Sequence, residues 1–199
     1  MSKKEQKIFS IKDYHNEEQT NIIFECYKTG KQFLDASIRI NGNILPEHFA
    51  LISTILYIPL LTNISLSCEF FLKAYNLIKN KQFKEHHDLY DLYAESKDLK
   101  TPFMELYKKV KTKEGIKNFT AKEMENVLKN CRNLYLEKYY FTKGIIKDIN
   151  LYIIEFLTKI CILLHSLITK NFPDFKKNIG PKNEEMEYYD HYFDNKESN

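Results

Sequence analysis

The 199-residue sequence contains little glycine and proline, five of each, and no glycine-rich phosphate-binding loop. So few turn-forming residues argue against a β-sandwich or β-barrel. The G-x-S-x-G, H-E-x-x-H and EF-hand patterns are also absent, and the six histidines are scattered apart from one adjacent pair. We therefore predict a helical protein and assign it neither a metal nor a cofactor.

No C-x-x-C motif is present, and the four cysteines lie at least 30 residues apart at Cys26, Cys68, Cys131 and Cys161. Buried free thiols in a reducing cytosol fit this spacing better than disulfides. No apolar segment of secretory type follows the N-terminus. The most apolar run, residues 151–168, is interrupted by Glu155, Lys159 and His165, so we interpret it as a core helix. The sequence thus indicates a cytoplasmic protein without a membrane span.

Arginine is scarce as well: only Arg39 and Arg132 occur among the 30 basic residues, and the net charge is +3. That charge leaves a nucleic-acid partner open without requiring one. An arginine retained among so many lysines suggests a need for its planar, five-donor guanidinium group. For either arginine alone, chance or an ordinary ion pair is the plainer explanation.

The length suits one domain with two polar ends. We expect a polar, mobile or loosely docked arm over residues 1–19, a helical bundle over 20–171 and an acidic, Tyr-rich tail over 172–199. The tail could dock onto a basic groove or be disordered. No stretch alternates in the manner of a β-strand.

Helices are expected over residues 21–40, 46–58, 60–79, 89–96, 101–111 and 121–141, followed by a final helix after Gly144. Gly30 interrupts the pattern of the first helix, and Pro59 should end or kink the second. Thr120 and Glu123 form a capping box that marks the start of the helix expected over residues 121–141. The final helix has two apolar stripes, so it lies either in the centre of the bundle or between the core and a dimer interface.

Two segments carry side chains suited to chemistry. On the capped helix, Arg132 and Asn133 are followed one turn later by Glu137 and Lys138. An arginine beside an amide and a carboxylate could hold a phosphodiester and move a proton, whereas a solvent-exposed Asn–Glu pair is the plainer interpretation. In the second segment, His87 precedes Asp88, which could be a functional pair or only the N-cap of a short helix.

Taken together, these segments resemble the HEPN superfamily of helical domains. Cys68-Glu-Phe-Phe-Leu-Lys-Ala74 is similar to its E-x-x-L-K-A stretch, and His87-Asp-Leu89 with Leu92-Tyr93 is similar to its H-D-L-x-x-L-Y turn. The helix with Arg132-Asn133 and the long apolar closing helix follow in the family's order. The resemblance spans about residues 43–170 and implies an antiparallel, HEPN-like bundle with a long apolar C-terminal helix.

Many members of this family are metal-independent endoribonucleases with an R-x4–6-H motif that act as dimers. Arg132 and Asn133 match its first half, but Glu137 and Lys138 stand where the histidine is expected. The resemblance implies an RNA- or nucleotide-binding homodimer of a bacterial defence or toxin–antitoxin system, with an antitoxin or regulatory protein as a further partner. If it cleaves RNA, Arg132, Asn133 and Glu137 are the expected catalytic residues, and His87 and Lys138 contact the substrate. The alternative is a noncatalytic helical interaction or regulatory module.

Overall fold

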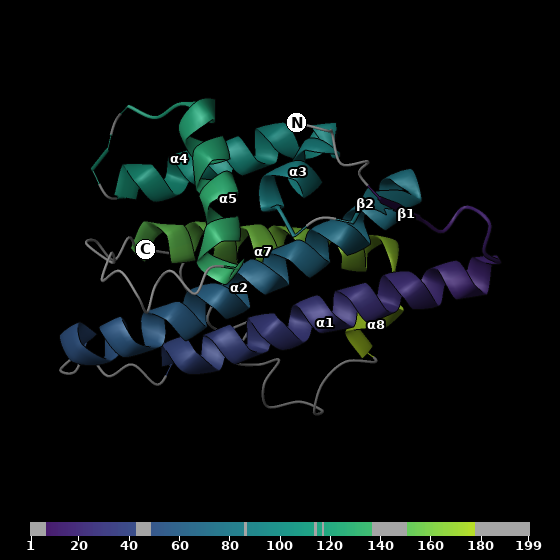
Figure 1. Cartoon of the computed structure of the whole chain (residues 1–199), viewed down its shortest axis with the longest axis horizontal. Helices are drawn as coiled ribbons and strands as arrows, with labels where there is room; N and C mark the ends of the chain where they lie inside the picture. Colours follow the sequence, from purple (N-terminus) through teal and green to yellow (C-terminus); the bar gives the residue numbers. More distant parts are fainter. Residues whose placement is uncertain are drawn as a thin grey trace. The chain divides into compact units, whose positions relative to one another are not determined.

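The computed structural model describes residues 7–42, 49–85, 87–113, 115–116, 118–136 and 151–177. The chain divides into two compact units, Met1–Ile168 and Thr169–Asn199, which are treated separately. In the first unit, helix α1 (Asn16–Gly42) and helix α2 (Phe49–Asn80) lie side by side, and α2 runs back along α1 (Figure 1). Most described residues are helical, which confirms the all-α class.

The close approach of α1 to α2 depends on Gly30. Helix α1 continues through this residue, and a Cβ atom placed there would lie only 2.9 Å from the ring of Phe71 on α2. Ser67, also on α2, donates its hydroxyl hydrogen bond to the Gly30 carbonyl oxygen at 2.8 Å. The glycine that interrupts the apolar pattern is therefore a contact point between two helices.

Pro59 was expected to end or kink a helix, and it lies inside α2, so no helix ends there and the two helices expected on either side of it are one. The ring is exposed and the proline removes one amide donor from the ladder. The side chains that follow it in α2 are mostly buried, among them Leu60, Leu61 and Ile64. Burial of this continuous face offsets a local loss of about 3 kcal/mol.

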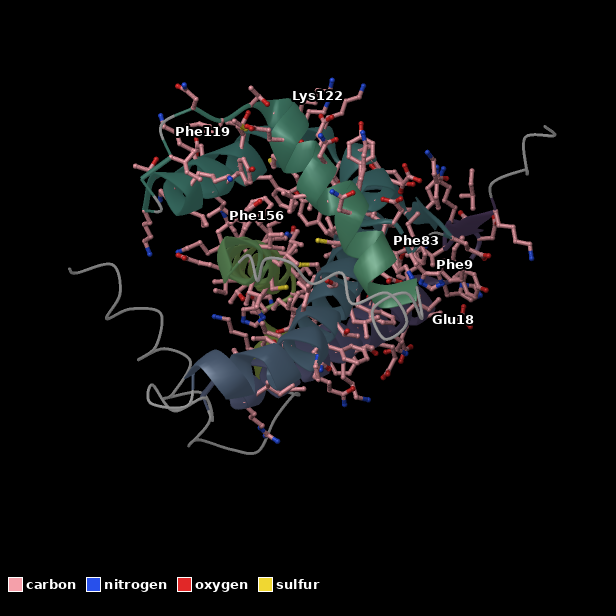
Figure 2. The ribbon with its side chains drawn as sticks, turned by 60° about the vertical axis from the view of Figure 1, so that its left-hand side comes forward. Phe9, Glu18, Phe83, Phe119, Lys122 and Phe156 are labelled. Atoms are coloured by element: carbon pink, nitrogen blue, oxygen red, sulfur yellow. The ribbon has the colours of Figure 1, made fainter. Side chains whose placement is uncertain are left out.

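The first unit also contains a two-stranded antiparallel sheet, contrary to the expectation that no sheet would form. Strand β1 (Ile8–Ser10) pairs with β2 (Gln82–Lys84), and Phe9 lies opposite Phe83. These two rings stack with centroids 5.2 Å apart (Figure 2). The N-terminal arm expected over residues 1–19 thus holds β1 and the beginning of α1 within its described part.

Local capping signals place the next helices. Asp88 caps α3 (Leu89–Ala94) by accepting hydrogen bonds from the amides of Tyr90 and Asp91, as the sequence indicates. A 3-10 turn, η2 (Lys97–Leu99), leads into α4 (Lys100–Lys113), which begins slightly before the expected start. Thr120 and Glu123 form the predicted capping box at the start of α5 (Ala121–Leu136), with bonds of 2.7 and 3.2 Å.

Helix α7 (Leu151–Asn171) supplies much of the core of the first unit. Phe156 packs edge-on against Tyr107 of α4, with centroids 5.1 Å apart, and Tyr27 of α1 bonds to His165 at 3.0 Å. The Cys161 Sγ lies 3.2 Å from the Cys68 Sγ of α2. Both thiols are free and buried, as is that of Cys131, while Cys26 is half-buried. The prediction of buried free thiols is confirmed for Cys68, Cys131 and Cys161.

Within the described residues, one segment, Tyr152–Asn171, is long and apolar enough to cross a membrane, and 39% of its most apolar window is buried in the structure. Core helices of soluble proteins meet the same criterion. The fully buried side chains of this helix include Phe156, Leu157, Ile160 and Leu164. These residues belong to the core of the first unit.

The described part of the second unit is short. It contains the last residues of α7 and helix α8 (Asp174–Lys177), and the rings of Phe172 and Phe175 stack with centroids 4.7 Å apart. The rest of the predicted tail, residues 178–199, lies outside the described residues, as do the residues around Gly144.

Candidate functional site

The most unusual polar group in the described core is the carboxylate of Glu69, in the middle of α2. Glu69 is only 3% exposed. Lys73, one helical turn later, donates a hydrogen bond from its Nζ to Glu69 Oε1 at 2.6 Å. The Nδ1 atom of His87 lies 2.9 Å from the same oxygen. We call Glu69, Lys73 and His87 the Glu69 cluster.

The cluster contains a charge pair in a place where charge is costly. Moving a carboxylate and an ammonium group out of water costs several kcal/mol per ion, and only good geometry and further hydrogen bonds offset this. The ammonium group of Lys73 also lies 5.2 Å from the ring centre of Phe70 and 5.5 Å from that of Phe83. The electron-rich faces of these two aromatic rings stabilise the positive charge of the ammonium group. An apolar helix that keeps such a pair, beside an accessible histidine, is a candidate functional site.

The turn that carries His87 is fixed at both ends. After it, Asp88 caps α3, and Leu89 anchors that helix in the core. Before it, the carboxylate of Glu95 accepts hydrogen bonds from the Lys84 amide of β2 at 3.0 Å and from Asn76 Nδ2 of α2 at 3.4 Å. The side chain of His87 is 58% exposed, so the turn presents it to solvent while one ring nitrogen stays on Glu69.

Helix α5 passes close to this turn. Lys129 Nζ lies 4.0 Å from the ring centre of Tyr90 on α3. Burial raises the pKa of the Cys131 thiol to about 12, and the negative charge of Asp88 contributes to that increase. Arg132 is the next residue of α5.

Helix α5, which carries Arg132, packs against α2, which carries the Glu69 stretch, and against α3, which follows the His87-Asp88 turn. Arg132 and Asn133 lie in α5, but their side chains are outside the described part. Glu137 and Lys138 fall outside the described residues altogether. His87, expected to contact a substrate, is the one site residue whose side chain the structure describes.

The sequence did not single out Glu69 and Lys73 as candidate site residues, and they served only to identify the resemblance. The available signal was an acidic and a basic residue four positions apart inside an otherwise apolar helix. The sequence also suggests a small basic patch of Lys79, Lys81 and Lys84 with Phe83 that could contact phosphate, and two of these side chains have partners in the structure. Phe83 is buried against Phe9, and Lys79 Nζ lies 3.5 Å from the carboxylate of Asp98.

Among the described residues, no group of three or more His, Cys, Asp or Glu side chains is arranged to hold a metal ion. The fold and the site define a mostly helical protein in which the side chain of an accessible histidine contacts a buried Glu–Lys pair. Comparison with known proteins identifies no relative: no protein-family model, no curated protein and no solved structure matches the chain.

Proposed function

We propose that the chain is a HEPN-like protein that binds RNA or nucleotide phosphates and acts as a homodimer in a bacterial defence or toxin–antitoxin system. In this proposal it is also a candidate metal-independent endoribonuclease. The cytoplasm is the compartment in which such a protein would act. The antitoxin or regulatory partner would be encoded beside it.

The observation that supports this proposal is the packing of α5, which carries Arg132, against α2, which carries Glu69 and Lys73, and against α3, which follows His87. The Glu69 cluster itself offers an accessible imidazole and a buried ammonium group. Imidazole and guanidinium groups both donate hydrogen bonds to phosphate oxygens, and arginine can do so in two-pronged fashion. A phosphate-containing ligand is therefore the class of ligand that this combination suits best.

In this proposal each residue has a distinct role. Arg132 holds the phosphate and Asn133 orients it, while His87 and Lys138 contact the ligand. If RNA is cleaved, Arg132 also stabilises the charge that develops on the phosphorane, and Glu137 is the base that the sequence offers. The last helices of two chains would face each other and bring two copies of Arg132 to a shared cleft.

The test measures RNA and nucleotide binding by fluorescence anisotropy over a range of salt concentrations. Arg132→Ala is expected to weaken RNA binding roughly tenfold or more, because a charge-assisted hydrogen bond is lost. Arg132→Lys should recover only part of the affinity, since lysine lacks the planar fork. Arg39→Ala, at the only other arginine, is the matched control and should bind like the wild type.

Light scattering coupled to size exclusion tests the dimer, and an RNA-cleavage assay with chelator present tests the enzyme. Loss of cleavage in Arg132→Ala but not in Arg39→Ala would support catalysis at this site. If the wild type binds neither RNA nor nucleotides, the proposal is wrong and the noncatalytic interaction module becomes the better explanation.

A further inference from the structure

Two free thiols meet between α2 and α7, and the proposed function uses neither of them. Cys68 Sγ lies 3.2 Å from Cys161 Sγ, although the two positions are 93 residues apart in the chain. Their side chains are almost completely buried, with exposed fractions of 1% and 0%. A single buried cysteine often serves only as a small apolar side chain. Two cysteines in direct contact on different helices can also be oxidised to a disulfide.

The two thiols face each other across the contact between α2 and α7. Cys68 Sγ lies 3.3 Å from the carbonyl oxygen of Leu157, and Cys161 Sγ lies 3.8 Å from that of Ile64. Each carbonyl belongs to the residue one helical turn before the other cysteine, so each thiol lies against the backbone of the opposite helix. Since the S–S bond of a disulfide is about 2.05 Å long, the two sulfur atoms need to approach by about a further 1.2 Å. Atoms in folded proteins fluctuate by about 0.5–1 Å, so this approach does not require unfolding.

The surroundings of the pair favour the reduced state until an oxidant reaches it. Burial raises the pKa of the Cys68 thiol well above its ordinary value, and the hydrogen bond with Cys161 adds to this increase. Because the thiolate is the reactive form, the closed structure protects the pair. Folded proteins open locally and briefly, and such an opening between α2 and α7 would admit a small hydroperoxide. Disulfides in reducing compartments, where they occur, are usually transient and redox-sensing.

We propose that Cys68 and Cys161 form a redox-sensitive pair, which a hydroperoxide converts reversibly to a disulfide that joins α2 to α7. One thiolate attacks the peroxide, so that an S–O bond forms while the O–O bond breaks, and hydrogen peroxide leaves a sulfenic acid and water. The other thiol attacks that sulfur, the S–S bond forms, and the S–O bond breaks with loss of a second water. The two sulfur atoms lose two electrons in total, and the peroxide gains them.

The reverse step and the consequence for the fold follow from ordinary disulfide chemistry. A dithiol restores both thiols by exchange and becomes a disulfide itself. While the link between Cys68 and Cys161 is present, it restricts the unfolded chain and holds α7 against α2, which stabilises the first unit. This redox chemistry does not depend on RNA or nucleotide binding.

The experiment treats the folded chain with hydrogen peroxide, alkylates the remaining thiols in denaturant and maps disulfides by mass spectrometry. Peptides that contain Cys68 and Cys161 should be linked. The melting temperature should rise by about 4–16 °C, the usual effect of a disulfide on a chain of this length, and dithiothreitol should reverse both changes. Cys68→Ala should show neither the link nor the rise. The matched control Cys26→Ala, which removes a half-buried cysteine of α1, should behave like the wild type.

Three results would overturn the proposal. If Cys68 and Cys161 stay reduced in the folded chain while peroxide oxidises the urea-unfolded chain, the two cysteines serve only in packing. A link from either of them to Cys26 or Cys131 would assign the chemistry to another pair. A disulfide that does not raise the melting temperature, or that dithiothreitol does not remove, would refute a reversible link between the helices. None of these measurements involves RNA, so they leave the proposed function to its own test.

Discussion

Replacement of Gly30 by alanine tests the packing of α1 against α2. In an exposed helix this change would stabilise the protein by about 1 kcal/mol, because alanine has the higher helix propensity. Here the new Cβ would lie 2.9, 3.1 and 3.2 Å from three ring atoms of Phe71. Carbon atoms in contact prefer about 3.5–4.0 Å. The substitution therefore overpacks the interface, which typically costs about 1–3 kcal/mol.

Phe71 has little room to move away. It is fully buried, and its ring centroid lies 5.7 Å from that of Tyr27 and 6.3 Å from that of His165. Separation of the helices would also stretch the hydrogen bond from Ser67 to the Gly30 carbonyl, which is worth about 1 kcal/mol. Since these costs exceed the gain in propensity, we expect Gly30→Ala to lower the free energy of unfolding by about 1–2 kcal/mol.

Urea denaturation followed by circular dichroism measures this change. The control Gln32→Ala, at an exposed position of the same helix, should stay within about 0.5 kcal/mol of the wild type. Phe71→Leu makes space beside Gly30, so the double variant should be less destabilised than the sum of the two single changes. Stabilisation by Gly30→Ala, or strict additivity in the double variant, would refute the packing argument.

Three further predictions concern other positions. Asn76→Ala should lower the free energy of unfolding, measured by urea denaturation, by about 2–4 kcal/mol, because it leaves the Ser96 hydroxyl and the Leu92 carbonyl without their buried partner. The control Asn126→Ala, at an exposed site, should leave that free energy unchanged, and equal effects of the two changes would contradict the argument. Lys81→Gly should raise thermal stability by about 1 kcal/mol, because Lys81 has a φ of 58°, and an unchanged melting temperature would contradict that reason. Burial raises the pKa of the Cys131 thiol from 9.0 to about 12 in the folded protein, so as the pH rises the unfolded chain loses this proton before the folded chain does. The free energy of unfolding should therefore fall between pH 9 and 12, and it should fall less in Cys131→Ala.

Local signals were sufficient to predict several elements correctly. The capping box of Thr120 and Glu123 and the cap at Asp88 involve residues within three positions of each other, so the sequence alone contains both partners. The helical period of the sequence likewise predicts a buried stripe, because a helix places residues three and four apart on one face. Its predicted members are Met124, Val127, Leu128, Cys131, Leu134, Tyr135 and Tyr139. The first four, whose side chains the structure describes, are buried. Such patterns need no knowledge of the rest of the fold.

Errors arose where the outcome depends on distant parts of the chain. Strand β1 alternates too briefly to be recognised, and it exists because Phe9 finds Phe83 across more than 70 residues. Pro59 has an unfavourable local propensity, which burial of the surrounding helix face overrides. The candidate site belongs to the same class. His87 and Arg132 are visible as motifs, but the role of Glu69 is not, because its partner lies 18 residues away in another element.

From the sequence alone one can infer that this protein is built from helices, where several of them begin, and that Cys68, Cys131 and Cys161 are buried thiols. These properties follow from composition, capping and periodicity, which act over a few residues. Two features became visible only in the folded chain. Gly30 lies against the ring of Phe71, and Lys73 and His87 both contact the same carboxylate oxygen of Glu69. Contacts of this kind form when helices pack, and helix packing is set by the whole chain at once.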